Sequence, residues 1–272
     1  MARQAKTEKL LDLARGILAD DHPMTVRQVY YQLVARQAIA NNRNKYQTVS
    51  RLLVDARKDG TIPWEWVEDR LRRPRSVSMW DSLPAFVEDA ARAFRLNVWD
   101  TQPGYIETWL EKDALSGIFE DILAGYGVTL NVGRGYDGWD SIKNAARRMG
   151  DGDGVTILYF GDFDPSGEDM ARSLEERLAF FGCHPTITKC ALTADDITRY
   201  RLPPDPAKRT DTRAAEFIAK NGDISVELDA LPGAVLRDRI RQEIESRLDL
   251  PRLKAIHTQE ATERAQLLAH WG

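Results

Sequence analysis

Two aspartates separated by one residue follow a strongly apolar stretch of this chain. Asp162 and Asp164 come directly after residues 154–161, which carry valine, isoleucine, leucine and aromatic side chains. In an extended chain, side chains at positions i and i+2 point in the same direction, so the two carboxylates can face one hard cation. The spacing therefore predicts a magnesium site.

The elements around this pair are those of an α/β sheet. Residues 154–161 have the continuous apolar character of a central parallel strand that is buried on both faces. Pro165, Ser166 and Gly167 end the strand, and apolar residues at helical spacing over 168–181 predict a helix. The acids therefore lie where a strand leads into a helix, which is the edge where open α/β sheets bind ligands.

A third acid follows a second predicted strand. Residues 105–110 have strand character, Glu111 and Lys112 come next, and a helix follows. A third unit comprises a strand over 128–132, a glycine turn at 133–135 and a helix over 139–149. If right-handed crossovers join these units, Glu111 and the two aspartates fall on the same edge of one sheet.

At these residues the chain resembles the Toprim fold and, more narrowly, the A subunit of topoisomerase VI and the related meiotic double-strand-break enzymes. The resemblance rests on Glu111-Lys112, the glycine turn, and Asp162-Phe163-Asp164-Pro165-Ser166-Gly167. It implies an α/β fold in which an N-terminal helical winged-helix domain precedes a Rossmann-like, mainly parallel Toprim domain. It also implies Mg²⁺ bound by Glu111, Asp162 and Asp164, with Glu111 taking part in catalysis.

The same resemblance implies a tyrosine that attacks DNA. In that family an arginine is followed four residues later by the second of two aromatic residues, and here these positions are Arg27 and Tyr31. Helical geometry agrees, because residues 26, 29, 30, 33 and 34 form an apolar stripe that makes Tyr30 a core residue. Tyr31 is then one turn above Arg27 and free to react. A phenol has a pKa of about 10, so it needs a neighbour such as Arg27 to stabilise its anion.

We expect three segments. Residues 1–78 form the winged-helix DNA-binding domain with the nucleophilic tyrosine, 79–103 form a connection, and 104–272 form the metal-binding Toprim domain with C-terminal helices. Within the first, helices are predicted over 7–18, from 25 onwards and over 48–58, and a short hairpin or wing begins at 61–64.

Charge is distributed unevenly along the chain. The net charge is -4, but residues 1–100 hold 17 basic and 13 acidic residues, which favours DNA contact through the first domain. The predicted DNA contacts are Arg43, Lys45, Arg51, Arg57, Lys58, Arg72, Arg73 and Lys112. Each of these side chains also fits a solvated face, and Lys112 also fits a local ion pair with Asp113.

A further acidic pair has the same i, i+2 spacing as the aspartates. Glu227 and Asp229 fit an additional metal ligand, but residues with this spacing more often only form hydrogen bonds within a loop.

Three classes of function stay open. The first is Mg²⁺-dependent DNA cleavage and rejoining through a 5'-phosphotyrosyl intermediate, of type IIB topoisomerase character. The second is a Toprim nuclease that uses water as its nucleophile, and the third is a non-catalytic DNA-binding module. For the first class, the resemblance implies double-stranded DNA as partner and a homodimer in which the tyrosine of one protomer meets the metal site of the other.

The last expectations concern a partner subunit and the location of the protein in the cell. The chain has no recognisable ATPase, so directed strand passage would need a separate ATPase subunit. It holds two cysteines, no apolar run of membrane-spanning length and no secretory signal pattern. We therefore expect a cytoplasmic, nucleoid-associated protein with no membrane partner.

Overall fold

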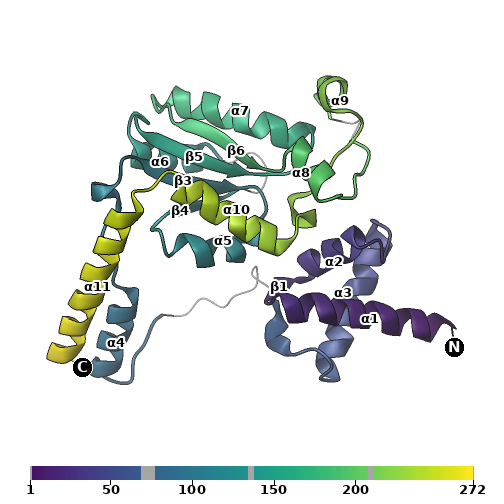
Figure 1. The fold of residues 1–272 in the computed structure, drawn as a ribbon, viewed down its shortest axis with the longest axis horizontal. Coiled ribbons are helices and arrows are strands. Elements are labelled where there is room, and N and C mark those ends of the chain that lie inside the picture. Colours follow the sequence, from purple (N-terminus) through teal and green to yellow (C-terminus); the bar gives the residue numbers. More distant parts are fainter. Residues whose placement is uncertain (1, 69–76, 134–137, 208–210, 272) are drawn as a thin grey trace.

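The computed structural model describes residues 2–68, 77–133, 138–207 and 211–271 (Figure 1). These residues form a mixed α/β structure that is 59% helical and contains a parallel sheet of four strands. The strands are β3 (Tyr105–Leu110), β4 (Thr129–Val132), β5 (Val155–Phe160) and β6 (Thr186–Ala191), in the spatial order β4-β3-β5-β6. Each strand predicted in this region is therefore present, to within two residues at either end.

Helices cover both faces of this sheet. On one face, α6 (Trp139–Met149) and α7 (Pro165–Phe180) pack against alternate residues such as Ile157 and Tyr159. On the other face, α5 (Ser116–Leu123) and α10 (Gly233–Glu245) pack against Leu158 and Phe160. The continuous apolar run of β5 follows from this arrangement, because both sets of alternating side chains are buried.

The first helices form a second hydrophobic core. The helices α1 (Ala2–Asp20), α2 (Val26–Ala35) and α3 (Arg43–Lys58) enclose it, with Val29, Leu33 and Leu53 fully buried. The helix predicted over 48–58 begins earlier, at Arg43, because Asn42 caps it by accepting a hydrogen bond from the backbone N–H of Lys45.

The hairpin expected from residue 61 is not formed by the described residues. Instead η1 (Trp64–Trp66) is a single 3₁₀ turn, and β2 (Val67–Glu68) pairs in parallel with β1 (Met24–Thr25). Ile62 accounts for the difference, because its side chain is fully buried in the core and its N–H donates to the carbonyl of Ala56. The chain is thereby held against the end of α3 instead of turning outwards.

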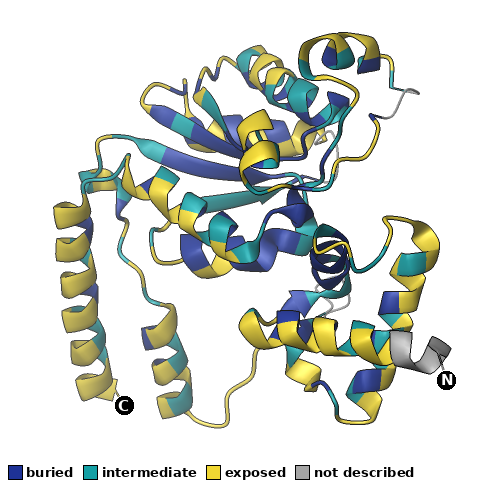
Figure 2. Cartoon of the chain, turned by 45° about the vertical axis from the view of Figure 1, so that its right-hand side comes forward, coloured by how far each residue is buried: buried dark blue, intermediate teal, exposed yellow. Residues whose placement is uncertain are grey.

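Two helices far apart in the sequence form an arm. Within the expected connection over 79–103, the chain forms α4 (Leu83–Ala93). This helix lies antiparallel to α11 (Leu250–Trp271), away from the sheet (Figures 1 and 2). Arg264 on α11 joins the two helices by donating to the carbonyl oxygen of Phe94, the C-cap of α4, at 2.9 Å. Arg264 also donates to Glu260, one turn earlier in α11, at 2.6 Å.

The remaining elements connect the sheet to these helices. They are η2 (Trp99–Thr101), η3 (Asp113–Leu115), α8 (Ala194–Arg199), α9 (Ala214–Asn221) and η4 (Leu228–Ala230). Of the helices in the described ranges, none combines the length and the apolar character that crossing a membrane requires.

Candidate active site

The sheet brings Glu111 and Asp162 together. Leu110 and Phe160 are paired in register at the ends of β3 and β5, so the residues that follow them are neighbours. Glu111 Oε2 accepts a hydrogen bond from the backbone N–H of Asp162 at 3.0 Å. The common edge predicted from the sequence is therefore the one observed.

Two glycines make this close approach feasible. A Cβ atom on Gly161 would lie 2.7 Å from Glu111 Oε2 and 2.7 Å from the hydroxyl of Tyr159. A Cβ atom on Gly167 would lie 2.3 Å from the backbone oxygen of Asp162. Real Cβ atoms do not approach other atoms so closely, so both positions require glycine for the acids to lie as they do.

Asp164 has a structural task at this edge. It is the N-cap of α7, and its Oδ1 accepts from the N–H of Gly167 at 2.7 Å and from the hydroxyl of Ser166 at 2.8 Å. Helix capping therefore accounts for one oxygen of Asp164, as Asp commonly provides. It does not account for Asp162 or Glu111.

Burial and neighbouring carboxylates disfavour the ionised forms of the rim acids, which are Glu111 and Asp162 at the edge of the sheet. Burial raises the pKa of Asp162 to about 7, and the charge of Glu111 adds to this effect against the opposing charge of Lys112. Burial also raises the pKa of Glu111, with the charge of Asp164 contributing. A divalent cation would relieve this repulsion, and carboxylate oxygens are the donors that Mg²⁺ prefers.

In this conformation Glu111, Asp162 and Asp164 do not surround a position for a metal ion. Within the described ranges, no three His, Cys, Asp or Glu side chains are positioned to hold a metal as they stand. Asp162 Oδ2 instead faces Lys112 Nζ at 2.9 Å. The chemistry of the donor set fits Mg²⁺, and binding would require the Asp162 carboxylate to turn away from this ammonium.

Lys112 lies within a cluster of acids. Its side chain is 11% exposed, and Nζ also lies 2.5 Å from Glu227 Oε2 and 3.3 Å from Asp229 Oδ2. These charges raise the pKa of Lys112 although burial alone would lower it. In this conformation the ammonium pairs with acids that are distant in the sequence, and contact of Lys112 with DNA stays a prediction.

Arg27 and Tyr31 lie on the other side of this acid cluster. The guanidinium carbon of Arg27 is 5.1 Å from the centre of the Tyr31 ring, as expected for residues one turn apart. Arg27 Nε lies 3.2 Å from Asp229 Oδ2, and its NH2 group pairs with Glu227. Burial alone would lower the pKa of Arg27, but the two facing acids raise it.

Tyr31 is less accessible than the sequence suggested. The prediction that Tyr31 is free to react is wrong for this conformation, because only 8% of the residue is exposed. Tyr31 belongs to the hydrophobic core of the first helices, and the turn η4 packs against α2. Burial together with the charge of Glu227 raises the pKa of its hydroxyl despite the opposing effect of Arg27. Tyr30 is core, as predicted, with its hydroxyl bonded to Asn41 at 2.8 Å.

Glu227 and Asp229 are the residues whose role the sequence left open. They bridge Arg27 on α2 to Lys112 at the sheet edge, and Asp229 is 2% exposed. In this conformation they serve as ion-pair partners. Their i, i+2 spacing indicates that the two acids act as a pair. The neighbouring sequence does not indicate their partners, because Arg27 and Lys112 lie more than 100 positions away.

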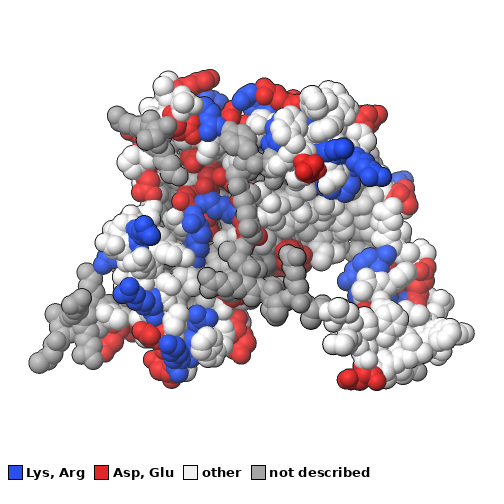
Figure 3. All heavy atoms as spheres, turned by 180° about the vertical axis from the view of Figure 1, so that it is seen from behind, with Lys and Arg blue, Asp and Glu red and all other residues white. Residues whose placement is uncertain are grey.

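The predicted DNA contacts on α3 are mostly at the surface. Arg43, Arg51 and Lys58 are exposed and Lys45 is half-buried. Arg57 differs, because its guanidinium lies 4.7 Å from the centre of the Trp64 ring and donates to the carbonyl of Leu53. Arg72 and Arg73 lie outside the described residues. Figure 3 shows basic and acidic side chains interspersed over the face that it presents.

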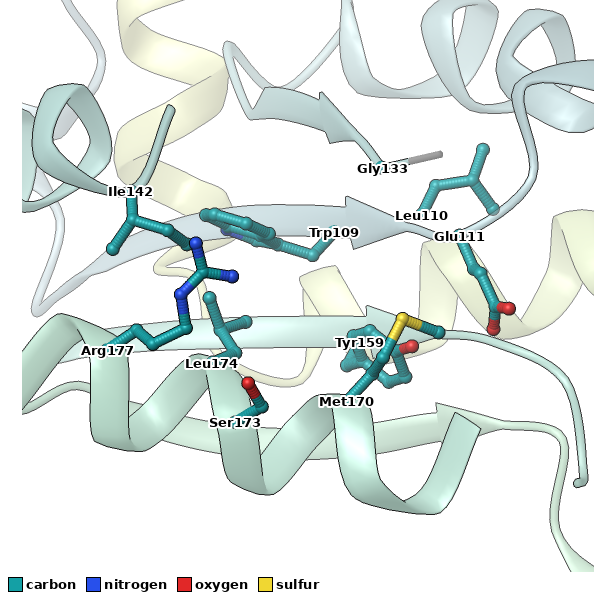
Figure 4. A pocket seen from close by; sticks show the side chains of 10 residues that line it. All are labelled: Trp109, Leu110, Glu111, Gly133, Ile142, Tyr159, Met170, Ser173, Leu174 and Arg177. Carbon is teal, nitrogen blue, oxygen red and sulfur yellow. The ribbon is translucent and has the colours of Figure 1, made fainter. Parts of the chain in front are cut away.

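A narrow groove leads away from Glu111 between the sheet and α7 (Figure 4). It encloses about 30 Å³ and ends at Arg177. Trp109 lines it, and the indole N–H of this residue is buried without a hydrogen-bond partner in the described part of the chain. The space is that of about one water molecule, so the groove does not accommodate an organic substrate.

A scan against protein-family models finds no match for this chain, and a search of curated proteins finds none either. Function is therefore inferred from the motifs of the chain and from the geometry of its side chains.

Proposed function

We propose that this protein cleaves and rejoins double-stranded DNA through a 5'-phosphotyrosyl intermediate, in the manner of a type IIB topoisomerase A subunit. One observation carries the proposal. The Tyr31 ring and the acids at the sheet edge adjoin one charged cluster. The guanidinium carbon of Arg27 lies 5.1 Å from the centre of the Tyr31 ring, and Arg27 pairs with Glu227. Glu227 also pairs with Lys112, which contacts Asp162. A cluster of partly buried charges beside a tyrosine is typical of functional sites.

The reaction is a transesterification. The Tyr31 oxygen forms a bond to phosphorus, the bond between phosphorus and the 3'-oxygen breaks, and the phenolic proton ends on that oxygen. The proton passes from the phenol to the leaving oxygen through solvent. Mg²⁺ held by Glu111, Asp162 and Asp164 would stabilise the charge on the phosphate and on the leaving oxygen.

The described conformation is a resting state in this proposal. With Tyr31 mostly covered and its pKa raised, attack on DNA requires α2 to separate from residues 227–229. DNA phosphates are natural competitors for this contact, because Arg27 is 39% exposed and pairs with acids that a phosphate can replace. Substrate binding would then release the nucleophile.

The finer architecture and the partners belong to the same proposal. It assigns a winged-helix domain to residues 1–78 and a Toprim domain to 104–272. One tyrosine cuts one strand, so a double-strand break requires a homodimer. Directed strand passage would require a separate ATPase subunit, and a DNA substrate in a cell implies a cytoplasmic, nucleoid-associated protein.

The test is covalent trapping. The protein is incubated with end-labelled duplex DNA and Mg²⁺, and the reaction is stopped with detergent. We expect protein attached to 5' ends, loss of this adduct in Tyr31→Phe, and its retention in the matched Tyr30→Phe variant. Cleavage that survives Tyr31→Phe would instead identify a nuclease that uses water. A protein that binds DNA without any Asp162-dependent chemistry would identify a non-catalytic module.

A further inference from the structure

Aromatic side chains gather on the surface where α6 begins and α7 ends. Trp139 is 54% exposed and Phe180 is 73% exposed, and their ring centres lie 5.3 Å apart. The ring centre of Phe181 lies 5.1 Å from that of Phe180, and the guanidinium carbon of Arg177 lies 4.7 Å from the centre of the Trp139 ring. We refer to Trp139, Phe180, Phe181 and Arg177 as the aromatic platform. Large aromatic residues seldom stay exposed together unless they bind a partner.

Basic side chains adjoin the platform. An open hollow of about 400 Å³ lies beside it, and Phe181 forms part of its wall. Lys143 and Arg147 line the same hollow, together with one acid, Asp140. With Arg177 included, three cations and one carboxylate surround the exposed rings, which favours an anionic partner.

We propose that the aromatic platform binds unpaired bases of single-stranded nucleic acid, with Lys143, Arg147 and Arg177 contacting the phosphates. Every base has a π-face that can stack on an exposed aromatic ring, and a basic groove beside such rings follows the strand. In a duplex these base faces are covered by neighbouring base pairs, so the platform selects single strands. A protein partner fits less well, because lysine is depleted in the cores of protein interfaces.

This inference goes beyond the proposed function, because it uses neither Tyr31 nor the rim acids. The platform is nevertheless connected to the rim, since Arg177 also lines the groove that begins at Glu111 (Figure 4). A strand held at the platform would therefore lie on the same side of the sheet as α6 and α7.

The experiment measures binding of a fluorescein-labelled oligothymidylate by fluorescence anisotropy without Mg²⁺, so that no cleavage occurs. We expect Phe180→Ala and Trp139→Ala to weaken binding about tenfold each, the usual effect of losing one stacked base. Trp271→Ala is the matched control, because Trp271 is 60% exposed on α11, and its binding should be unchanged. Lys143→Glu combined with Arg147→Glu should lower both the affinity and its salt dependence.

Several outcomes would overturn the proposal. These are an absence of oligothymidylate binding by the natural chain at low salt, equal binding by Phe180→Ala, or tighter binding to a duplex of the same length that depends on the same rings. A change of oligomeric state in Phe180→Ala would identify the platform as a protein interface. If Trp139→Ala does not fold, Phe180→Ala still tests the proposal, since Phe180 is 73% exposed and its loss leaves the core intact. Covalent trapping on duplex DNA should be unaffected by Phe180→Ala, which separates this test from that of Tyr31.

Discussion

The ammonium of Lys112 lies 2.9 Å from Asp162 Oδ2, at the point where the sheet edge meets the turn η4, which packs against α2. The same ammonium pairs with Glu227 and Asp229, which in turn pair with Arg27 on α2. Lys112 is therefore the link between the candidate metal ligands and the helix that carries the candidate nucleophile.

Replacing Lys112 by methionine should destabilise the protein strongly. Removing one partner of a buried ion pair typically costs about 3–5 kcal/mol, because the other charge is left uncompensated. Here Asp162 loses its ion-pair partner, whereas Glu227 and Asp229 keep Arg27. Urea unfolding followed by circular dichroism measures the loss. Arg172→Met is the control. Arg172 pairs with Asp169 at the surface, where 59% of the arginine side chain is exposed, and such surface pairs contribute at most about 1 kcal/mol. Equal effects of the two substitutions would contradict the role given to Lys112.

Magnesium should stabilise the folded protein. A ligand present at 100 times its Kd adds about 2.7 kcal/mol to the free energy of unfolding. For a chain of 272 residues this corresponds to an increase in Tm of several degrees, at roughly 2–4 °C per kcal/mol. Differential scanning fluorimetry with and without Mg²⁺ measures this shift. Asp162→Asn should abolish it and the exposed Asp195→Asn should not, so a shift retained in Asp162→Asn would rule out the proposed ligand.

Gly161→Ala should disturb the site through Glu111. The added methyl group would lie 2.7 Å from Glu111 Oε2, so the carboxylate or the chain must move. Overpacking of this kind usually costs about 1–3 kcal/mol, and we expect the Mg²⁺-dependent increase in Tm to diminish as well. In Gly16→Ala, a Cβ has no atom within 4 Å in helix α1, so that variant should be slightly more stable by about 1 kcal/mol. An unchanged metal response in Gly161→Ala would show that Glu111 is not a ligand.

Asp196 predicts a specific dependence of stability on pH. Burial alone would raise the pKa of Asp196, but hydrogen bonds from Arg239 and Thr193 lower it below its usual value. The carboxylate therefore stabilises the fold fully above the unfolded-state pKa of about 3.9, and this contribution is lost as the pH falls through the lower folded-state pKa. The two Arg239 nitrogens lie 2.7 Å from its oxygens.

Asp196→Asn is the variant that measures this contribution. We expect it to be less stable than the natural chain by about 2 kcal/mol at pH 7, because a charge-assisted pair is lost. The difference should shrink below about pH 4, where the carboxylate begins to protonate. Urea unfolding of both proteins over this range gives the comparison, and a difference that grows on acidification would refute the assignment.

Much of the sheet was predictable because its signals are local. Residues 105–110 and 139–149 were predicted with the bounds that β3 and α6 have, since apolar periodicity reports directly on which faces are buried. The meeting of Glu111 with Asp162 followed from strand order, because parallel neighbours end at the same edge.

The surroundings of Tyr31 and Lys112 were not predictable in this way. A helical wheel identifies the apolar stripe of α2, but it cannot reveal that η4, about 200 positions later, packs on the adjacent face. The hydrogen bond of Gln32 to the carbonyl of Leu231 belongs to the same contact. Likewise the three partners of Lys112 come from two distant segments, at 162 and at 227–229, so local sequence suggested only Asp113 or a phosphate.

The most direct measurement is to identify the residue that carries DNA after trapping. The detergent-stopped complex is digested with nuclease and trypsin, and tandem mass spectrometry locates the remaining nucleotide on the peptide that follows Arg27. The account predicts a 5'-phosphate ester on the Tyr31 oxygen, formed only when Mg²⁺ is present. A nucleotide on another residue, a linkage to a 3' end, or cleaved DNA without any protein adduct would contradict it.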